Sequence, residues 1–403
     1  MVEAVLSPPV SSLLNQHDSF DLLCACATAN PSAHQISCIA QAADSSLDWT
    51  FFLHLAEHHG ILPLVARNLT TNARGLPAEI SHLLQSAYEA NLRRSLWFAS
   101  ELSRVHKHFE ERQLSAIAYK GPVLAQSAYA DIGLRSFSDL DFLISSADFA
   151  RAKLALAEIG YQPSQQFPPA VERFFLHTGY ERSFDCEAGK NLLELQWSLL
   201  PRFYAVDFES ADFAFNDLFA RSQPVEICGG TIRGLSPEDS LLALSIHAAK
   251  HLWTRLIWIA DIVHTLNSHA IDISLVIARA QALGIRRILA VSFWLANRLL
   301  GTTVPLETKS LIEEDSEVRK CGERCLSRMS GAATYNFESS AYFKEIAKLR
   351  ERSADRLRYL WRLASIPSAG DIAALQLPQT LFPLYHAVRA ARLLRKITWG
   401  TSD

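Results

Sequence analysis

The sequence predicts an α+β protein in which a small mixed β-sheet core is flanked by two helical regions. Apolar residues recur at helical spacing through much of residues 1–112 and again from 236 onward. Between these regions, short apolar runs are bounded by glycine and acidic residues, as strands and their turns are. We therefore divide the chain into an N-terminal helical region (1–112), a sheet core (113–235) and a C-terminal helical region (236–403).

Composition and charge are those of a globular protein. Of the 403 residues, 49% are apolar and 20% are charged. The formal net charge of -3 provides no general attraction to nucleic acid or to anionic membrane. The sequence has no run of about 18 apolar residues and no secretory signal pattern, so we expect a cytoplasmic protein without a transmembrane segment. Seven cysteines show no zinc-site spacing and are expected to be free thiols.

The first elements are helices followed by a strand. The stretches “SSLDWTFFLHLAEHHGILPLVARNL” and “EISHLLQSAYEANLRRSLWFASELSRVHKHFEER” predict the N-terminal helices. “SAIAYKG” then predicts a short strand, and “PVLAQSAYA” predicts a helix with Pro122 in its first turn, where proline is tolerated. The core therefore begins as strand, turn and helix.

The rest of the core alternates strands with a helix. We predict a strand at “DLDFLIS”, a helix from about 147 to 159, strands around 179–185 and 191–199, and a hairpin at “VEICGGTIRGL” with a tight turn at Gly229-Gly230. Ser236-Pro237-Glu238-Asp239 has the residues of a helix start. One helix is predicted to run from there to about 266, and several more helices to about 396.

Acidic residues on two predicted strands indicate a metal site. Asp139 and Asp141 share one strand face, because residues i and i+2 point the same way. Two carboxylates held so close repel each other unless a positive charge lies between them. Glu194 lies on another strand, on the face opposite an apolar one. Three carboxylates beside a phosphate-holding turn are what two Mg²⁺ ions need to clamp a triphosphate.

The turn at Lys120-Gly121 is the candidate phosphate site. It follows a strand and precedes a helix, where backbone N–H groups and the helix N-terminus can hold a phosphate. Taken alone, each signal has a simpler interpretation: a solvated strand end, a surface glutamate and an ordinary helix-entry turn. Their order and spacing favour the combined site.

“AYKGPVLAQSAYADIGLRSFSDLDFLI” resembles the signature of the bacterial family of uncharacterised nucleotidyltransferases, within the DNA polymerase beta-like superfamily. The resemblance continues through “LLELQWSL” and “LSPEDSLLALSIHAAKHLWTRLIWIADI”, and so covers most of residues 40–270. It implies a polymerase beta-like core and catalytic metal ligands for Mg²⁺ at Asp139, Asp141 and Glu194. It also implies phosphate binding by Lys120, Gly121 and Arg135.

The sequence departs from the family pattern at two positions, and these departures limit which family properties can be expected of this chain. Gln196 stands where many relatives carry histidine, which weakens any role of that position in proton transfer but leaves the metal triad intact. Lys120-Gly121 replaces the superfamily's commoner Gly-Ser, so the superfamily's mode of nucleotide binding carries over only loosely.

A polar stripe is predicted on the helix after Ser236, where a helical period brings together His247, Lys250, His251, Thr254, Trp258 and Asp261. The stripe is suited to form the far wall of a nucleotide cleft, with Lys250, His251 and Asp261 as further nucleotide-binding residues. The alternative is a solvated helix face with one packed tryptophan.

These features predict an Mg²⁺-dependent nucleotidyltransferase that moves an NMP group from an NTP, such as ATP, to an acceptor. The acceptor is a peptide, a small metabolite or an RNA end, and the modest charge counts against RNA. The alternatives are a non-catalytic nucleotide-binding module of the same fold and a kinase-like phosphotransferase. The sequence has no glycine-rich loop of the kind that kinases use, which counts against the second alternative.

The basic segment “FPLYHAVRAARLLRKITW” carries Arg389, Arg392, Arg395 and Lys396. Such a segment predicts either weak contact with anionic membrane or a helix packed on its own domain.

Overall fold

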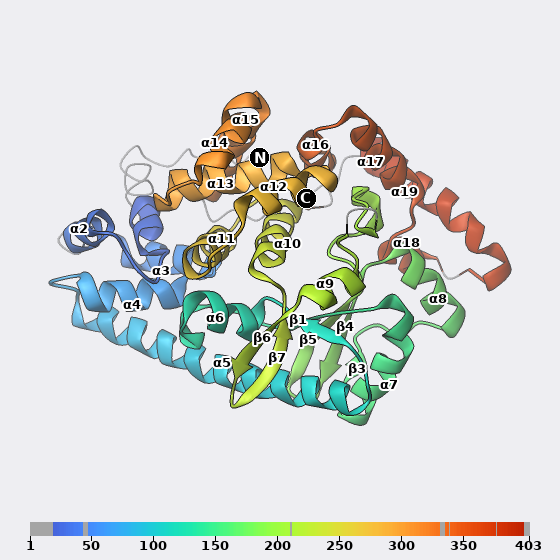
Figure 1. Cartoon of the computed structure of the whole chain (residues 1–403), viewed down its shortest axis with the longest axis horizontal. Coiled ribbons are helices and arrows are strands. Elements are labelled where there is room, and N and C mark those ends of the chain that lie inside the picture. Colours follow the sequence, from blue (N-terminus) through green and yellow to red (C-terminus); the bar gives the residue numbers. More distant parts are fainter. Residues whose placement is uncertain are drawn as a thin grey trace, which may run out of the picture.

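A computed structural model describes residues 19–42, 47–209, 212–330, 335–337, 339–375 and 377–398. The α+β class is confirmed: a five-stranded mixed sheet lies between helical flanks (Figure 1). The division into three regions with boundaries at 112 and 235 stays a prediction.

The N-terminal region forms the predicted helices, which are α2 (Ala33–Ala42), α3 (Trp49–His58), α4 (Leu62–Asn72) and α5 (Ala78–Glu111). Gly60 separates α3 from α4 with a positive φ of 72°, a conformation that glycine adopts at little cost. The long helix α5 runs along the lower side of the molecule in Figure 1 and reaches the sheet core with its second half.

The main sheet has the strand order β1-β2-β5-β4-β3. Its strands are β1 (Ala116–Ala118), β2 (Leu140–Ile144), β3 (Gln162–Pro163), β4 (Glu181–Cys186) and β5 (Gly189–Gln196). The pair β2–β5 is parallel and the other pairs are antiparallel, so the sheet is mixed as predicted.

The core's helices are α6 (Gly121–Tyr129), α7 (Phe149–Glu158), α8 (Pro169–Thr178) and α9 (Phe215–Arg221). The sequence patterns do not predict α8 and α9. The hairpin forms a separate sheet of β6 (Gln223–Ile227) and β7 (Gly230–Gly234). Its tight turn lies at Cys228-Gly229, one residue earlier than predicted, because these two residues have the positive φ values of the turn.

The two faces of the main sheet differ in polarity. Strand alternation turns Phe142 and Leu195 toward an apolar cluster that includes Phe98 and Phe109 of α5 and Phe149 of α7. The opposite face is left for the polar residues of the same strands. The functional candidates lie on that face.

The C-terminal region consists of α10 (Pro237–Lys250), α11 (Leu256–Ser268), α12 (Ile273–Ala282), α13 (Arg286–Leu300), α14 (Leu306–Glu314), α15 (Ser316–Met329), α16 (Ser340–Leu349), α17 (Ser353–Ser365), α18 (Ala369–Ala374) and α19 (Tyr385–Thr398). One apolar cluster joins α3 and α4 to α10, α11 and α13, so the two helical regions share a core.

The single helix predicted up to 266 is wrong, because α10 ends at Lys250 and α11 begins at Leu256. Leu252 and Trp253 have φ values of 49° and 48°, which end the helix. Trp253 is completely buried, and its Nε1 donates a hydrogen bond to Ser292 Oγ at 3.0 Å. Tertiary burial of this indole therefore overrides the helical pattern.

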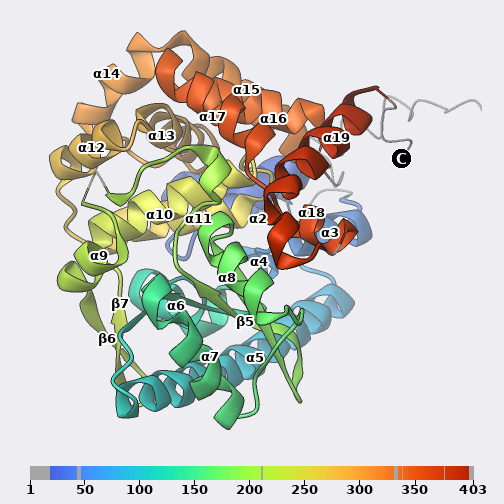
Figure 2. The ribbon, with the colours of Figure 1, turned by 90° about the vertical axis from the view of Figure 1, so that its right-hand side faces the viewer.

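The C-terminal helix α19 packs against the rest of the chain. Arg389 and Arg392 both form ion pairs with Asp371, and Tyr385 is buried in a cluster with Phe174 and Phe175 of α8. Figure 2 shows α8 below α18 and α19. Among the described helices, none combines the length and apolar character needed to cross a membrane. All seven cysteines are free.

Candidate functional site

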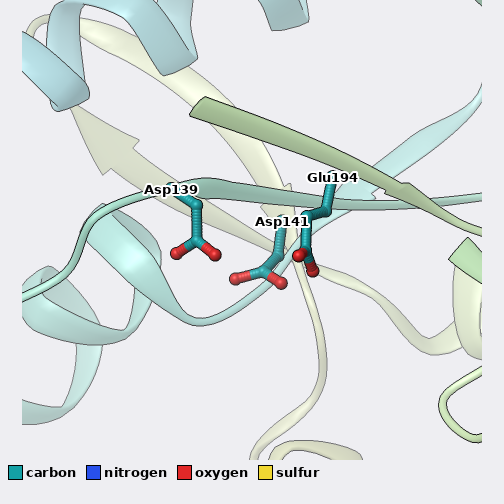
Figure 3. Close-up of side chains that lie close together, drawn as sticks. All are labelled: Asp139, Asp141 and Glu194. Atoms are coloured by element: carbon teal, nitrogen blue, oxygen red, sulfur yellow. The ribbon is translucent and has the colours of Figure 1, made fainter. Parts of the chain in front are cut away.

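The three predicted carboxylates meet on the polar face of the sheet. The parallel register places Asp141 of β2 opposite Glu194 of β5, and Asp139 comes just before β2. One oxygen from each carboxylate lies within 4.8 Å of the others. Figure 3 shows the three side chains on the same side of their strands. Together they offer a set of oxygen ligands for a metal ion.

Lys120 supplies a positive charge to this cluster. Its Nζ lies 2.7 Å from Asp141 Oδ1, and the side chain is only 10% exposed. The backbone of Lys120 has φ 59° and ψ -155°. Glycine adopts this conformation readily, whereas in any other residue it costs about 1–3 kcal/mol. This backbone conformation places Lys120 at the N-terminus of α6 with its ammonium beside Asp141.

Gly121 brings the start of α6 close to the start of β2. It has φ 42°, and a Cβ at this position would lie 3.3 Å from the backbone oxygen of Asp139. A larger residue would therefore be strained twice, by its φ and by the close contact. The Lys120-Gly121 turn and the Asp139 backbone thus form one packed unit.

Gln196 holds two of the carboxylates in place. Its Nε2 lies 3.0 Å from Asp141 Oδ1 and 3.0 Å from Glu194 Oε2 and donates to both. Its Oε1 accepts a hydrogen bond from the Tyr119 hydroxyl. An amide does not exchange protons with a substrate, so the geometry gives Gln196 a positioning role.

A fourth carboxylate, Glu181, was missed by the sequence reasoning. It lies on β4 in register with Gln196, next to the strand that carries Glu194. The Tyr180 hydroxyl donates to its Oε1, while among the described residues its buried Oε2 has no hydrogen-bond partner. The alternation of side chains along the strand “GYERSFD” could have indicated Glu181, because it puts Glu181 and Ser183 on one face.

The site carries more negative charge than its surroundings neutralise. Burial, followed by repulsion from Asp141, raises the pKa of Glu194 to about 8. The same two causes raise the pKa of Asp139 to about 6. The raised pKa values mean that burial and mutual repulsion disfavour the ionised forms, which additional positive charge would favour. A divalent cation would supply it.

Arg135 and Asp261 are placed in a separate buried ion pair. Arg135 Nε lies 2.8 Å from Asp261 Oδ1 and Nη2 lies 2.9 Å from Oδ2, and the Tyr129 hydroxyl donates to the same carboxylate at 2.7 Å. The guanidinium would have to leave Asp261 before it bound a phosphate. The nucleotide-binding roles of both residues stay predictions, and the geometry favours a structural role.

The remaining members of the polar stripe do come together, although the helix that was predicted to carry them is broken. His251 stacks on Trp258 with ring centroids 4.9 Å apart, and His247 packs edge-on against both. Burial and then the charge of Lys250 lower the pKa of His251 to about 3, so the ring is neutral at pH 7. Lys250 Nζ lies 2.7 Å from the Tyr180 hydroxyl.

A cavity that Lys120 lines does not include the carboxylates. It measures about 280 Å³ and lies between α6, the β6–β7 hairpin and the helices α10 and α11. Lys120 lines it, but Asp139, Asp141 and Glu194 do not. The carboxylate cluster on the polar face of the sheet and this cavity are therefore separate features, and Lys120 adjoins both.

Comparison with known proteins gives one family. A sequence model of the family described as uncharacterised nucleotidyltransferase matches residues 45–301. The match spans α3 to α13 and includes all three carboxylates and the Lys120-Gly121 turn. Neither the curated proteins nor the solved structures gave a significant match.

Proposed function

The chain belongs to the uncharacterised nucleotidyltransferase family, and we propose that it transfers a nucleoside monophosphate from an NTP to an acceptor with the help of Mg²⁺. The observation that carries this proposal is the convergence of Asp139, Asp141 and Glu194, which in the described part of the chain have one ion-pair partner, Lys120. Buried acids are normally paired with cations of the chain, so three carboxylates beside one lysine favour a bound metal ion.

The donor set suits Mg²⁺. Magnesium takes oxygen ligands, and one or two carboxylates plus phosphate oxygens complete its coordination in many enzymes. Asp139 and Asp141 would hold the ion shared with the triphosphate, and Glu194 with Asp141 would hold a second one. When bound, Mg²⁺ would neutralise the phosphates and lower the pKa of the attacking hydroxyl.

The chain's own residues would orient the reactants. The Lys120 ammonium lies beside Asp141 at the N-terminus of α6, and both the ammonium and the helix N-terminus would favour an anionic triphosphate. The acceptor hydroxyl or amine would attack the α-phosphorus and form a new bond to it. The bond to the β-phosphate oxygen would break, pyrophosphate would leave with the electron pair, and the acceptor's proton would pass to water.

Finer assignments rest on this scheme. We propose ATP among the NTP substrates, a peptide or small molecule as acceptor in preference to RNA, and a cytoplasmic location. The pairing of Arg389 and Arg392 with Asp371 favours packing of α19 on its own domain over contact with a membrane. A non-catalytic nucleotide-binding module is the second candidate, because Lys120 already places one cation among the acids.

The test uses ATP labelled at the α- or the γ-phosphate, incubated with the protein and Mg²⁺. Water can replace the unknown acceptor, so a nucleotidyltransferase should release α-labelled AMP and pyrophosphate slowly. Glu194→Gln is the matched inactive control, and EDTA should stop the reaction. Release of γ-labelled orthophosphate, or γ-label on the protein, would indicate a kinase-like phosphotransferase. Tight binding of Mg²⁺-ATP without pyrophosphate release would indicate the binding module.

A further inference from the structure

A second cavity has a volume of about 330 Å³, and its lining does not include the carboxylates. Its walls come from the segment around Phe203, from Phe337 and from the helices α10, α16, α18 and α19. Six of its thirteen lining residues have aromatic rings: Phe203, Tyr204, His251, Phe337, Tyr342 and Phe343. Aromatic walls favour planar or cyclic groups, which stack against them or meet them edge to face.

The cavity is connected to the carboxylates by hydrogen bonds. Lys250 lines it and donates to the Tyr180 hydroxyl at 2.7 Å, and Tyr180 in turn donates to Glu181. Lys250 Nζ also lies 4.9 Å from the centre of the Tyr180 ring. The side chains of Lys250 and Tyr180 therefore link the cavity to Glu181 at the edge of the acidic cluster.

The charges around the cavity favour an anion. Lys250, Arg389 and Arg392 contribute three positive charges to its lining, and Asp371 pairs with both arginines. Among the described residues, Lys250 is hydrogen-bonded to the Tyr180 hydroxyl and forms no ion pair with a carboxylate, so its positive charge remains at the α10 side of the cavity. An anionic group on the ligand would be attracted there.

The position of the cavity relative to the sheet assigns its ligand. Lys120 and the start of α6 follow β1, on one side of the carboxylates, and Tyr180 precedes β4, on the other side. Attacking and leaving oxygens lie roughly in line in phosphoryl transfer. If pyrophosphate leaves toward Lys120, the acceptor must approach from the β4 side, where this cavity lies.

We propose that this cavity binds the acceptor, and that the acceptor is a small molecule with an aromatic or cyclic group and an anionic group. The identification of the ligand as the acceptor rests on the proposed function, whereas the chemical class of the ligand is inferred from the cavity alone. Its volume suits a small molecule, and its aromatic lining together with the cations at its ends sets the ligand class.

The test uses 8-anilino-1-naphthalenesulfonate, an aromatic sulfonate whose fluorescence rises in apolar sites. The wild-type protein should bind it in this cavity, and Phe343→Ala should weaken binding about tenfold, which is 1.4 kcal/mol. Leu393→Trp, which fills the cavity from α19, should weaken it at least as much. Trp361→Ala is the matched control, because Trp361 is 71% exposed on α17 and does not line the cavity, and it should change the affinity less than twofold.

A competition arm separates the acceptor from the nucleobase. Saturating Mg²⁺-ATP should leave the dye affinity within about twofold, because the triphosphate lies on the Lys120 side. Displacement of the dye by Mg²⁺-ATP would overturn the assignment and give the cavity to the nucleobase. Equal dye binding by wild type, Phe343→Ala and Leu393→Trp would also overturn it. Absence of pyrophosphate release from the wild type would count against the proposed function, while the dye titration would still report on the cavity.

Discussion

Two buried charge clusters in this chain both pair aspartate with a basic side chain but are balanced differently. At Asp261, a bidentate arginine and a tyrosine hydroxyl satisfy both carboxylate oxygens. At Asp139, Asp141 and Glu194, with Glu181 beside them, Lys120 Nζ is the cation paired with an acid among the described residues. The first cluster is complete without a ligand, and the second is not. Incomplete charge balance is what distinguishes the candidate site.

Other buried aspartates in the described part of the chain support this distinction. Asp239, Asp355 and Asp371 are each paired with two arginines: Arg221 and Arg279, Arg350 and Arg358, and Arg389 and Arg392. Removal of one partner from such a pair is costly, because the other charge stays buried without compensation. These pairs hold the fold together, whereas the triad is available for a reaction.

The largest effect is expected from Asp141→Asn, which removes the ligand at the centre of the triad. Loss of the metal's charge stabilisation should lower Mg²⁺-dependent AMP release by about 1,000-fold. The assay is pyrophosphate release from ATP, with Mg²⁺-ATP binding measured by calorimetry.

Asp139→Asn is the matched variant, with a similar loss of activity but an opposite effect on the fold. Its raised pKa shows that ionisation is disfavoured, so asparagine should stabilise the metal-free protein. Asparagine at 141 should destabilise it, because Lys120 loses its partner. Unchanged binding of Mg²⁺-ATP by both variants would rule out the metal site.

Asp261→Asn should break the balanced cluster and leave the triad working. A buried Arg135 without its charge partner should lower the free energy of unfolding by about 3 kcal/mol, measured by urea denaturation. The affinity for Mg²⁺-ATP should stay within a few-fold at temperatures where the variant is folded. A large loss of affinity with little loss of stability would instead place Arg135 and Asp261 in the nucleotide site, as the family resemblance implies for Arg135 and the polar stripe predicts for Asp261.

The triad could be predicted from the sequence because strand alternation is local information. Asp139 and Asp141 lie two residues apart, and Glu194 stands opposite an apolar strand face. Glu181 was harder to find, since its place beside Gln196 depends on the order of strands in the sheet. A single acid on a strand gives no sign of which strand will lie next to it.

Long-range contacts explain why two other features could not be read from the sequence. Arg135 and Asp261 are far apart in the sequence, so nothing local indicates that one neutralises the other. The helix predicted to run to 266 ends because Trp253 is buried against Ser292, and this contact forms only in the folded protein. In both cases burial in the folded protein decides the local structure, and the periodicity of residues in the sequence carries no information about that burial.

A smaller effect on the reaction is expected from Glu194→Gln. The ion bound with the triphosphate keeps Asp139 and Asp141, so the affinity for Mg²⁺-ATP should change only a few-fold. Turnover should fall by about 100-fold or more, because the carboxylate that would help activate the attacking oxygen is lost. Comparison of binding constants with rates of pyrophosphate release checks this. Normal turnover would reduce the site to two carboxylates that bind nucleotide.

The smallest effect is a pH dependence of stability in the metal-free protein. The ordinary carboxyl pKa of 4.5 is raised to about 8 at Glu194 in the folded state. Between these values the folded protein holds a proton that the unfolded chain has lost, so stability should fall as pH rises from about 5 to 8. Glu194→Gln removes this titration and should raise the melting temperature at pH 8 by about 2 °C or more, with little change at pH 5. Mg²⁺ should stabilise the wild type more at pH 8 than at pH 6, because it binds the ionised carboxylates. A wild-type stability that does not change over this pH range, with no added stabilisation by Mg²⁺ at pH 8, would contradict this prediction. It would mean that the charges of the triad are as well balanced as those of the Arg135–Asp261 pair.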